Sequence, residues 1–296
     1  MNNTVINIIG ILIIIWAVMM ILQRIMKPHQ EKAVKKKLEK TRSSVHKSDS
    51  DLLGRRYEVE RDGKDPVKVN IYEYHGSEEK VPMIFLFHGG TLLDGDADQM
   101  DSFCDRMKDQ WEADIISVNY SKLDEHQVPY PQEEIVDAVK YFAIHSSEIH
   151  GDAERIAFIG FSGGAYVMTG ACALLGQMGL KVRGMVEFYP LLDDSIIRLA
   201  DSHLIPCPVT LVTCNNAEMN RRCEVFEQHL EKAGVEVETR EYPDAMQGFI
   251  EYNNPEYLEN PQFRNNLKNF DEDQKAMASA CEIWLSGVFE GFFEEK

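Results

Sequence analysis

Apolar and polar positions alternate along most of this chain with two different periods. Short apolar runs that end in glycine or polar residues predict buried strands, whereas apolar residues three or four apart predict helices. From residue 55 onward the two patterns take turns, which is typical of a mostly parallel sheet with helices on both faces. The predicted elements are a hairpin over 56–74, strands at 81–90, 113–120, 155–164, 182–190, 207–215 and 236–244, and helices at 133–149, 165–179, 220–234 and 271–293.

The first part of the chain has a different pattern. Residues 5–22 form an apolar run of 18 residues in which only Asn7 is clearly polar. As a helix, this run would be about 27 Å long, close to the hydrocarbon thickness of a bilayer. A cleaved signal peptide is the rival interpretation, but no Lys or Arg precedes the run and no small-x-small cleavage site follows it. We therefore expect a transmembrane anchor at 5–23.

A basic stretch follows the expected anchor, with eight Lys and Arg between Arg24 and Arg42. Positive charge stays on the cytoplasmic side of a membrane, so we expect a single-pass membrane protein whose main domain is cytoplasmic. The stretch either lies against anionic lipid headgroups or forms a solvated spacer. The expected organisation is a short N-terminus at 1–4, the anchor at 5–23, a basic segment and linker at 24–54, and one α/β domain at 55–296.

Charge and cysteine content narrow the class of protein. The net charge is −18, and residues 1–49 hold nine Lys and Arg against three Asp and Glu, while the remainder holds 22 against 46. Because so acidic a body repels phosphates, a nucleic-acid partner is excluded. The six cysteines show no CxxC and no metal-ligand spacing, so we expect reduced core thiols and no metal site. They are Cys104, Cys172, Cys207, Cys214, Cys223 and Cys281.

One short motif carries catalytic chemistry. The sequence GFSGG, Gly160–Gly164, matches G-x-S-x-G and lies between a predicted buried strand and a helix of small residues. In that context the turn is so sharp that the Ser adopts a strained backbone, and the flanking glycines avoid collisions with the strand and helix. We therefore predict that Ser162 presents its hydroxyl at the positive end of a helix, as a nucleophile.

A second motif, HGGT at 88–91, directly follows the predicted strand at 81–90. A glycine-rich loop in this place can donate backbone N–H groups to a developing oxyanion, together with the N–H of the residue after the nucleophile. An ordinary loop after a strand is the alternative.

With these motifs in this order, the chain resembles the α/β-hydrolase fold and, more narrowly, the hormone-sensitive-lipase-like carboxylesterases. The resemblance covers about residues 55–293 and rests on FLFHGG, SVNY, IGFSGG and LEKAGVEVETREYPDAMQGF. It implies hydrolysis of small or medium acyl esters, without metal or cofactor, by a triad in the order Ser, Asp, His. Only about 54 residues separate Ser162 from Asn216, so little or no cap domain is expected between them.

Carried over by position, the resemblance implies a nucleophile at Ser162 and an oxyanion hole at Gly89, Gly90 and Gly163. Two departures are milder: Thr91 replaces the third glycine of the family's H-G-G-G, and NYSKLDE replaces its D-Y-R-L-A-P-E.

The other two triad positions depart from the family pattern. The catalytic His falls on Gln247, and the catalytic acid falls on Ala217, although a shift of one residue would offer Asn216 or Glu218. An amide neither takes nor gives a proton near neutral pH, so Gln247 cannot be a general base. The substitutes considered are Glu218, as a displaced acid or base, and His88, whose alternative role is to orient the oxyanion loop.

Two functions of different classes remain open at this point. One is a pseudoenzyme that keeps the pocket for a small acyl-type ligand, with ester hydrolysis lost or much reduced, and the departures at Ala217 and Gln247 favour it. The other is an active carboxylesterase that uses Ser162 and a rearranged base. The sequence does not determine the acyl length, the substrate or the oligomeric state.

Overall fold

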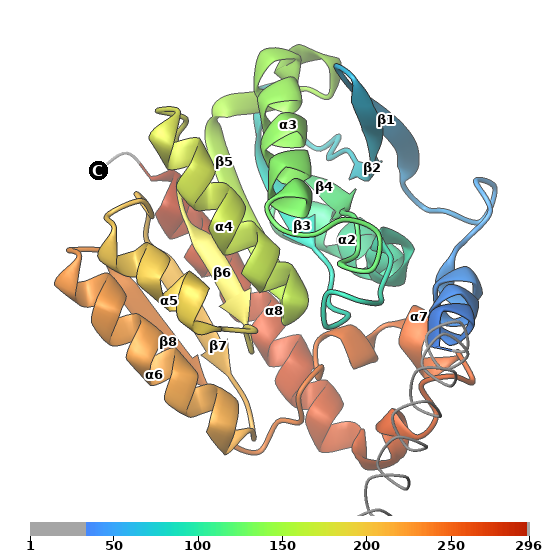
Figure 1. The fold of residues 1–296 in the computed structure, drawn as a ribbon. Coiled ribbons are helices and arrows are strands. Elements are labelled where there is room, and N and C mark those ends of the chain that lie inside the picture. Colours follow the sequence, from blue (N-terminus) through green and yellow to red (C-terminus); the bar gives the residue numbers. More distant parts are fainter. Residues whose placement is uncertain (1–33, 295–296) are drawn as a thin grey trace, which may run out of the picture. The chain divides into compact units, whose positions relative to one another are not determined.

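The structure, a computed structural model, describes residues 34–294. The chain divides into two compact units, residues 1–44 and 45–296. Of the first unit, residues 34–44 are described and are helical. The second unit contains the whole central sheet (Figure 1).

The central sheet has eight strands in the order β1-β2-β4-β3-β5-β6-β7-β8. The pairs β1/β2 and β2/β4 are antiparallel, and every other neighbouring pair is parallel, so the sheet is mostly parallel as predicted. The strands are β1 (Arg55–Arg61), β2 (Lys64–Tyr72), β3 (Val81–Phe87), β4 (Asp114–Asn119), β5 (Gly151–Phe161), β6 (Met185–Phe188), β7 (Val209–Thr213) and β8 (Val237–Glu241).

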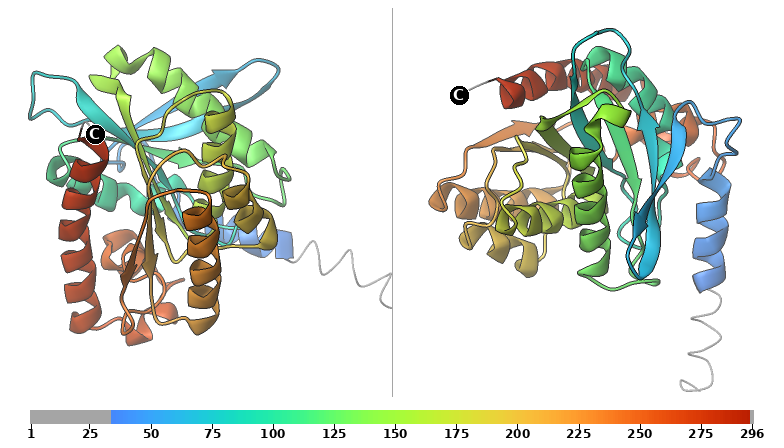
Figure 2. Two further views of the ribbon diagram at one scale, coloured as in Figure 1. Left: turned by 90° about the vertical axis from the view of Figure 1, so that its left-hand side faces the viewer. Right: turned by 90° about the horizontal axis from the view of Figure 1, so that it is seen from above.

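Helices cover both faces of this sheet because its central strands are apolar on both sides. Every residue of β3 and β6 is buried, which is the pattern of a parallel strand enclosed between two helical layers. One core cluster joins the sheet to α3, α4, α5 and α6, and a second joins it to α2 and α8 (Figure 2). These helices are α2 (Asp101–Gln110), α3 (Tyr130–Ile144), α4 (Gly163–Gln177), α5 (Asp194–Asp201), α6 (Ala217–Lys232) and α8 (Glu272–Phe293).

Short helical pieces complete the second unit, and three of them follow one another between the loop of Gln247 and α8. We call residues 251–270, which contain these three pieces, the C-terminal wall. The short pieces are η1 (Ala97–Met100), η2 (Ser146–Glu148), η3 (Glu251–Asn253), α7 (Pro255–Leu258) and η4 (Asn266–Asn269).

The structure confirms the predicted hairpin, strands and long helices, with shifted ends. Two helices, α2 and α5, were not among the predictions, because α2 is largely polar and α5 has only 8 residues. The connection from β6 to β7 holds α5 as its one helix, so little lies over the sheet there, in line with the expected lack of a large cap. All six cysteines are buried and free, as predicted.

The prediction of a single-pass membrane protein with a transmembrane helix needs correction. Within residues 34–294, no helix is both long enough and apolar enough to span a bilayer. The segment 5–23, on which that prediction and the predicted localisation were based, lies outside the described residues.

Candidate active site

Ser162 occupies the turn between β5 and α4 and has the strained backbone that the motif predicts. Its φ is 50° and its ψ is −111°, values that a residue with a Cβ rarely adopts. The turn is tied to the neighbouring strand, since the N–H of Ser162 donates to the carbonyl of Phe188 at 2.9 Å. The strain is therefore held by the sheet, and Ser162 stands directly before the first helical residue, Gly163.

The flanking glycines leave room for this turn. A Cβ added to Gly164 would lie 2.2 Å from the carbonyl oxygen of Phe87, and one added to Gly160 would lie 2.7 Å from the Cα of Ala165. Both neighbours are backbone atoms, which cannot rotate away. The packing of α4 against β3 requires glycine at 164, and its packing against β5 requires glycine at 160.

Gly164→Ala is expected to lower the free energy of unfolding by at least about 2 kcal/mol, because the new methyl group forces the start of α4 away from β3. Urea unfolding followed by tryptophan fluorescence measures the change. The matched control is Gly287→Ala in α8, where nothing lies within 4 Å of the added Cβ. That change should stabilise the protein by about 0.5–1 kcal/mol. Equal effects of the two substitutions would contradict the steric argument.

The predicted oxyanion loop packs against the turn at Gly160–Gly164, which we call the elbow. Gly90 has a φ of +136° and accepts a hydrogen bond from the N–H of Asp94 at 2.8 Å, which closes the loop into a tight turn. A Cβ on Gly163 would lie 2.8 Å from the backbone nitrogen of Leu92. The sequence-predicted residues Gly89, Gly90 and Gly163 are therefore brought beside Ser162.

His88, one of the two considered substitutes, has both ring nitrogens occupied. Nδ1 lies 2.7 Å from the carbonyl of Gly89, and Nε2 lies 3.1 Å from the ammonium of Lys122, which can only donate. The ring stacks on Tyr120 at 4.5 Å between centroids. Burial and the Lys122 ammonium hold the pKa of His88 well below its usual range. A neutral imidazole fixed in this way orients the oxyanion loop.

Gln247, on which the resemblance places the catalytic base, contacts Asn216, one of the three candidates for the acid position. The Nδ2 of Asn216 donates to Oε1 of Gln247 at 3.2 Å. The two loops are held together by a backbone bond, since the N–H of Asn215 donates to the carbonyl of Ala245 at 2.8 Å. Phe249 is fully buried against Tyr189 and Tyr242 and fixes the loop after Gln247.

Ala217 and Glu218, the two residues after Asn216, are both exposed. Ala217 is the first residue of α6 and is exposed, while Asn216 is the N-cap and accepts from the N–H of Met219 at 3.2 Å. Glu218, the other considered substitute, is exposed and pairs with Arg221, which lowers its pKa. Of the three candidates left open by the sequence, Asn216 is therefore the one that contacts Gln247.

These groups surround a cavity of about 370 Å³, within the size range of small-molecule sites. Ser162 and Gln247 line it from the elbow and the Gln247 loop, while Gly89 and Gly90 line it from the oxyanion loop. The remaining side is formed largely by the C-terminal wall, which contributes aromatic side chains and Glu251.

Glu251 is a buried carboxyl in this cavity that the sequence analysis missed. Its side chain receives a hydrogen bond from the hydroxyl of Tyr189, and Oε1 lies 3.1 Å from a Cβ built on Gly89. Burial raises the pKa of Glu251 to about 8. A lone Glu four residues beyond Gln247 forms no known motif, so the only signal was its place in an otherwise apolar and aromatic stretch, GFIEY.

Comparison with known proteins agrees with the fold described above. A family profile described as alpha/beta hydrolase fold matches residues 84–205. The versiconal hemiacetal acetate esterase of Dothistroma septosporum is 25% identical over 132 residues, which are 45% of this chain and 37% of that protein. The esterase LipI of Mycobacterium tuberculosis is 29% identical over 132 residues, 42% of this chain and 40% of that protein. The alignments thus span about two-fifths of the length of these curated relatives.

Solved structures match over more of the chain. The carboxylesterase EstE1 from a metagenomic library has a TM-score of 0.65 at 15% identity, covering 90% of this chain and 98% of that one. A thermostable esterase from Pseudomonas putida ECU1011 also has a TM-score of 0.65, at 16% identity, covering 90% and 91%. At such low identity these likenesses show the fold.

The sheet order, the strained Ser162 and the oxyanion loop beside it define a protein of the α/β-hydrolase fold. More narrowly, this fold is that of the esterase and lipase type, in line with the resemblance to the hormone-sensitive-lipase-like carboxylesterases.

Proposed function

We propose that this protein binds a small acyl-type ligand in the cavity at Ser162 and hydrolyses esters very slowly or not at all. The observation that carries the proposal is the hydrogen bond between Asn216 and Gln247. It joins two amides where an esterase of this type needs a carboxylate and an imidazole. Because amides do not exchange protons near neutral pH, nothing in this pair can activate the hydroxyl of Ser162.

The expected loss of rate is large but not total. Removing triad members costs about 10⁴–10⁶ in turnover, whereas an oxyanion hole and a binding pocket still give about 10³ over the uncatalysed reaction. The strained turn at Ser162 and the glycine loop at Gly89 and Gly90 line one cavity, which supports binding of an acyl carbonyl next to Ser162. This combination suits retention of an acyl-type ligand better than its turnover.

A second candidate function is an active esterase with a different base, and Glu251 is the observation that favours it. This carboxyl lines the same cavity as Ser162, and its pKa of about 8 would let it accept a proton in the neutral range. In this alternative Glu251 takes the proton of Ser162 and returns it to the leaving alcohol.

The test is to treat the full-length protein with a fluorophosphonate and to assay p-nitrophenyl acetate, with Ser162→Ala as the control. We expect labelling that takes hours, and ester turnover no more than about 10³-fold above buffer. Rapid labelling and fast turnover that both disappear in Ser162→Ala would refute the proposal. Loss of that fast turnover in Glu251→Gln as well would establish the alternative.

A further inference from the structure

The cavity at Ser162 has an unusual balance of charge. Two carboxylic side chains line it, Glu251 and Asp94, and among the described residues that line it there is no Lys, Arg or His. The position that would bring an imidazole into such a cavity is occupied by the neutral Gln247. The walls therefore offer a ligand two acidic side chains and no basic one.

Glu251 is the acidic group most deeply set in these walls. The residue is 6% exposed, and the hydroxyl of Tyr189 donates to its carboxyl. None of the ion pairs among the described residues involves Glu251. A carboxylate removed from water without a cation is disfavoured, and this is the physical reason for its raised pKa. A cationic ligand in the cavity would supply the missing partner.

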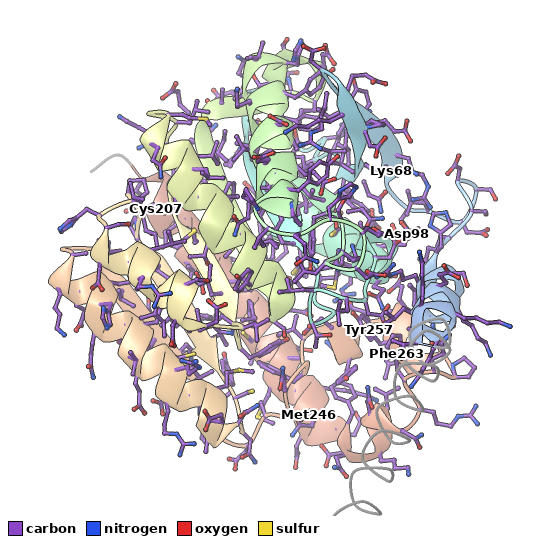
Figure 3. All side chains as sticks on the ribbon, in the orientation of Figure 1. Lys68, Asp98, Cys207, Met246, Tyr257 and Phe263 are labelled. Carbon is purple, nitrogen blue, oxygen red and sulfur yellow. The ribbon has the colours of Figure 1, made fainter. Side chains whose placement is uncertain are left out.

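Aromatic side chains line the same cavity as this carboxyl. Tyr189, Tyr252, Tyr257 and Phe263 all line the cavity. The ring centroids of Tyr257 and Phe263, both labelled in Figure 3, are 4.7 Å apart. Those of Tyr252 and Tyr257 are 5.5 Å apart, so the three rings pack against one another at the C-terminal wall. The faces of such rings attract organic cations within about 6 Å of the centroid.

We propose that the cavity binds an organic cation, namely an acyl compound that bears a quaternary or protonated amine. The ammonium group lies against Glu251 and the aromatic rings of the C-terminal wall, and the acyl group points toward Ser162 and the oxyanion loop. This inference rests on the proposed function, because it assumes that the cavity holds an acyl-type ligand. The net charge of −18 adds a long-range attraction for cations.

Isothermal titration of the full-length protein with two probes of the same shape tests the inference. Acetylcholine carries a quaternary nitrogen, and 3,3-dimethylbutyl acetate has a neutral carbon in its place. We expect acetylcholine to bind at least about 10-fold more tightly, since both the charge pair and the ring contacts favour it. Ser162→Ala serves as the background if turnover of either ester is detected.

Glu251→Gln should reduce the preference for acetylcholine to about 3-fold or less while leaving the affinity for the neutral ester nearly unchanged. The matched control is Glu241→Gln, which removes one carboxylate from an exposed position on β8 and should leave the preference intact. Equal binding of the two probes to the wild-type protein would overturn the inference but not the acyl-ligand function. Absence of binding by both probes would contradict the two together.

The pH dependence gives a second measurement that needs no variant. Affinity for acetylcholine should rise between pH 6 and pH 9, as Glu251 loses its proton, while affinity for the neutral ester stays constant. The other ionisable groups that line the cavity are Asp94 and the phenols of Tyr189, Tyr252 and Tyr257, and burial raises the pKa of the last two. A flat profile for acetylcholine would contradict a role for Glu251.

Discussion

The double substitution Asn216→Asp with Gln247→His is expected to raise turnover of p-nitrophenyl acetate by about 10³-fold or more. The two side chains already form a hydrogen bond, so a carboxylate at 216 and an imidazole at 247 would occupy positions from which they can pair. Asp is as good an N-cap as Asn, so α6 should keep its start. Initial rates with wild-type, single and double variants measure the gain, and Ser162→Ala in the double variant should abolish it.

The matched control tests which residue holds the acid position. Ala217→Asp with Gln247→His keeps the new imidazole at 247 and moves the new carboxylate from 216 to 217. Because Ala217 is the exposed first residue of α6 and does not contact Gln247, we expect a gain at least about 10-fold smaller. Equal gains would place the acid at 217. No gain in either folded double variant would mean that the cavity does not present an ester to Ser162.

The parts of the site that a local motif dictates could be predicted from the sequence. The turn at Ser162 needs glycine on both sides because backbone atoms lie within about 3 Å of where a Cβ would be, and that steric need leaves the readable pattern GFSGG. The loop after β3 needs glycine at Gly90 for the same reason, because a Cβ there would lie 2.0 Å from the carbonyl oxygen of Asp94. In both places glycine is required by close contacts at the end of a strand or the start of a helix, and such positions can be recognised in a sequence.

Residue spacing alone did not identify the side chain that contacts Gln247. Counting forward from β7 and backward along α6 gave Ala217, but the side chain that reaches Gln247 belongs to the residue just before the helix. A helix boundary can shift by one or two residues without changing the apolar pattern that predicts it. The signal that would have identified Asn216 is its capping ability, since Asn is strongly favoured directly before a helix.

The cavity wall opposite the elbow was not predictable for a different reason. The C-terminal wall consists of short helical pieces with neither helical nor strand periodicity. Its contribution to the cavity depends on how it packs on the sheet, which no local pattern encodes. Glu251 and the aromatic residues near it could therefore not be predicted as site residues, and only the fold shows that they line the same cavity as Ser162.

Asp98→Ala is expected to lower the free energy of unfolding by about 3–5 kcal/mol, the largest stability effect that we predict. The Asp98 side chain is completely buried and accepts hydrogen bonds from two nitrogens of Arg56 at 2.9 and 2.8 Å. It also accepts from the side chain of Asn70 and from the backbone N–H of Lys47, each at 2.8 Å. Its removal takes the acceptor from these donors and one hydrogen bond from the segment before β1. Urea unfolding of both proteins measures the loss.

Asp49→Ala provides the matched control, because Asp49 also pairs with Arg56, at 2.6 Å, but its side chain is 86% exposed. Its loss should cost less than about 1 kcal/mol, since water screens an exposed pair.

Burial disfavours the charged form of Asp98, but the hydrogen bonds from Arg56, Lys47 and Asn70 outweigh it and lower the pKa of Asp98. A carboxyl with a lowered pKa stabilises the fold above its unfolded pKa and ceases to do so as the pH falls through the folded value. The difference between wild type and Asp98→Ala should therefore shrink below about pH 4. A difference that stays constant down to pH 2 would mean that shape, not charge, accounts for the stabilisation by Asp98.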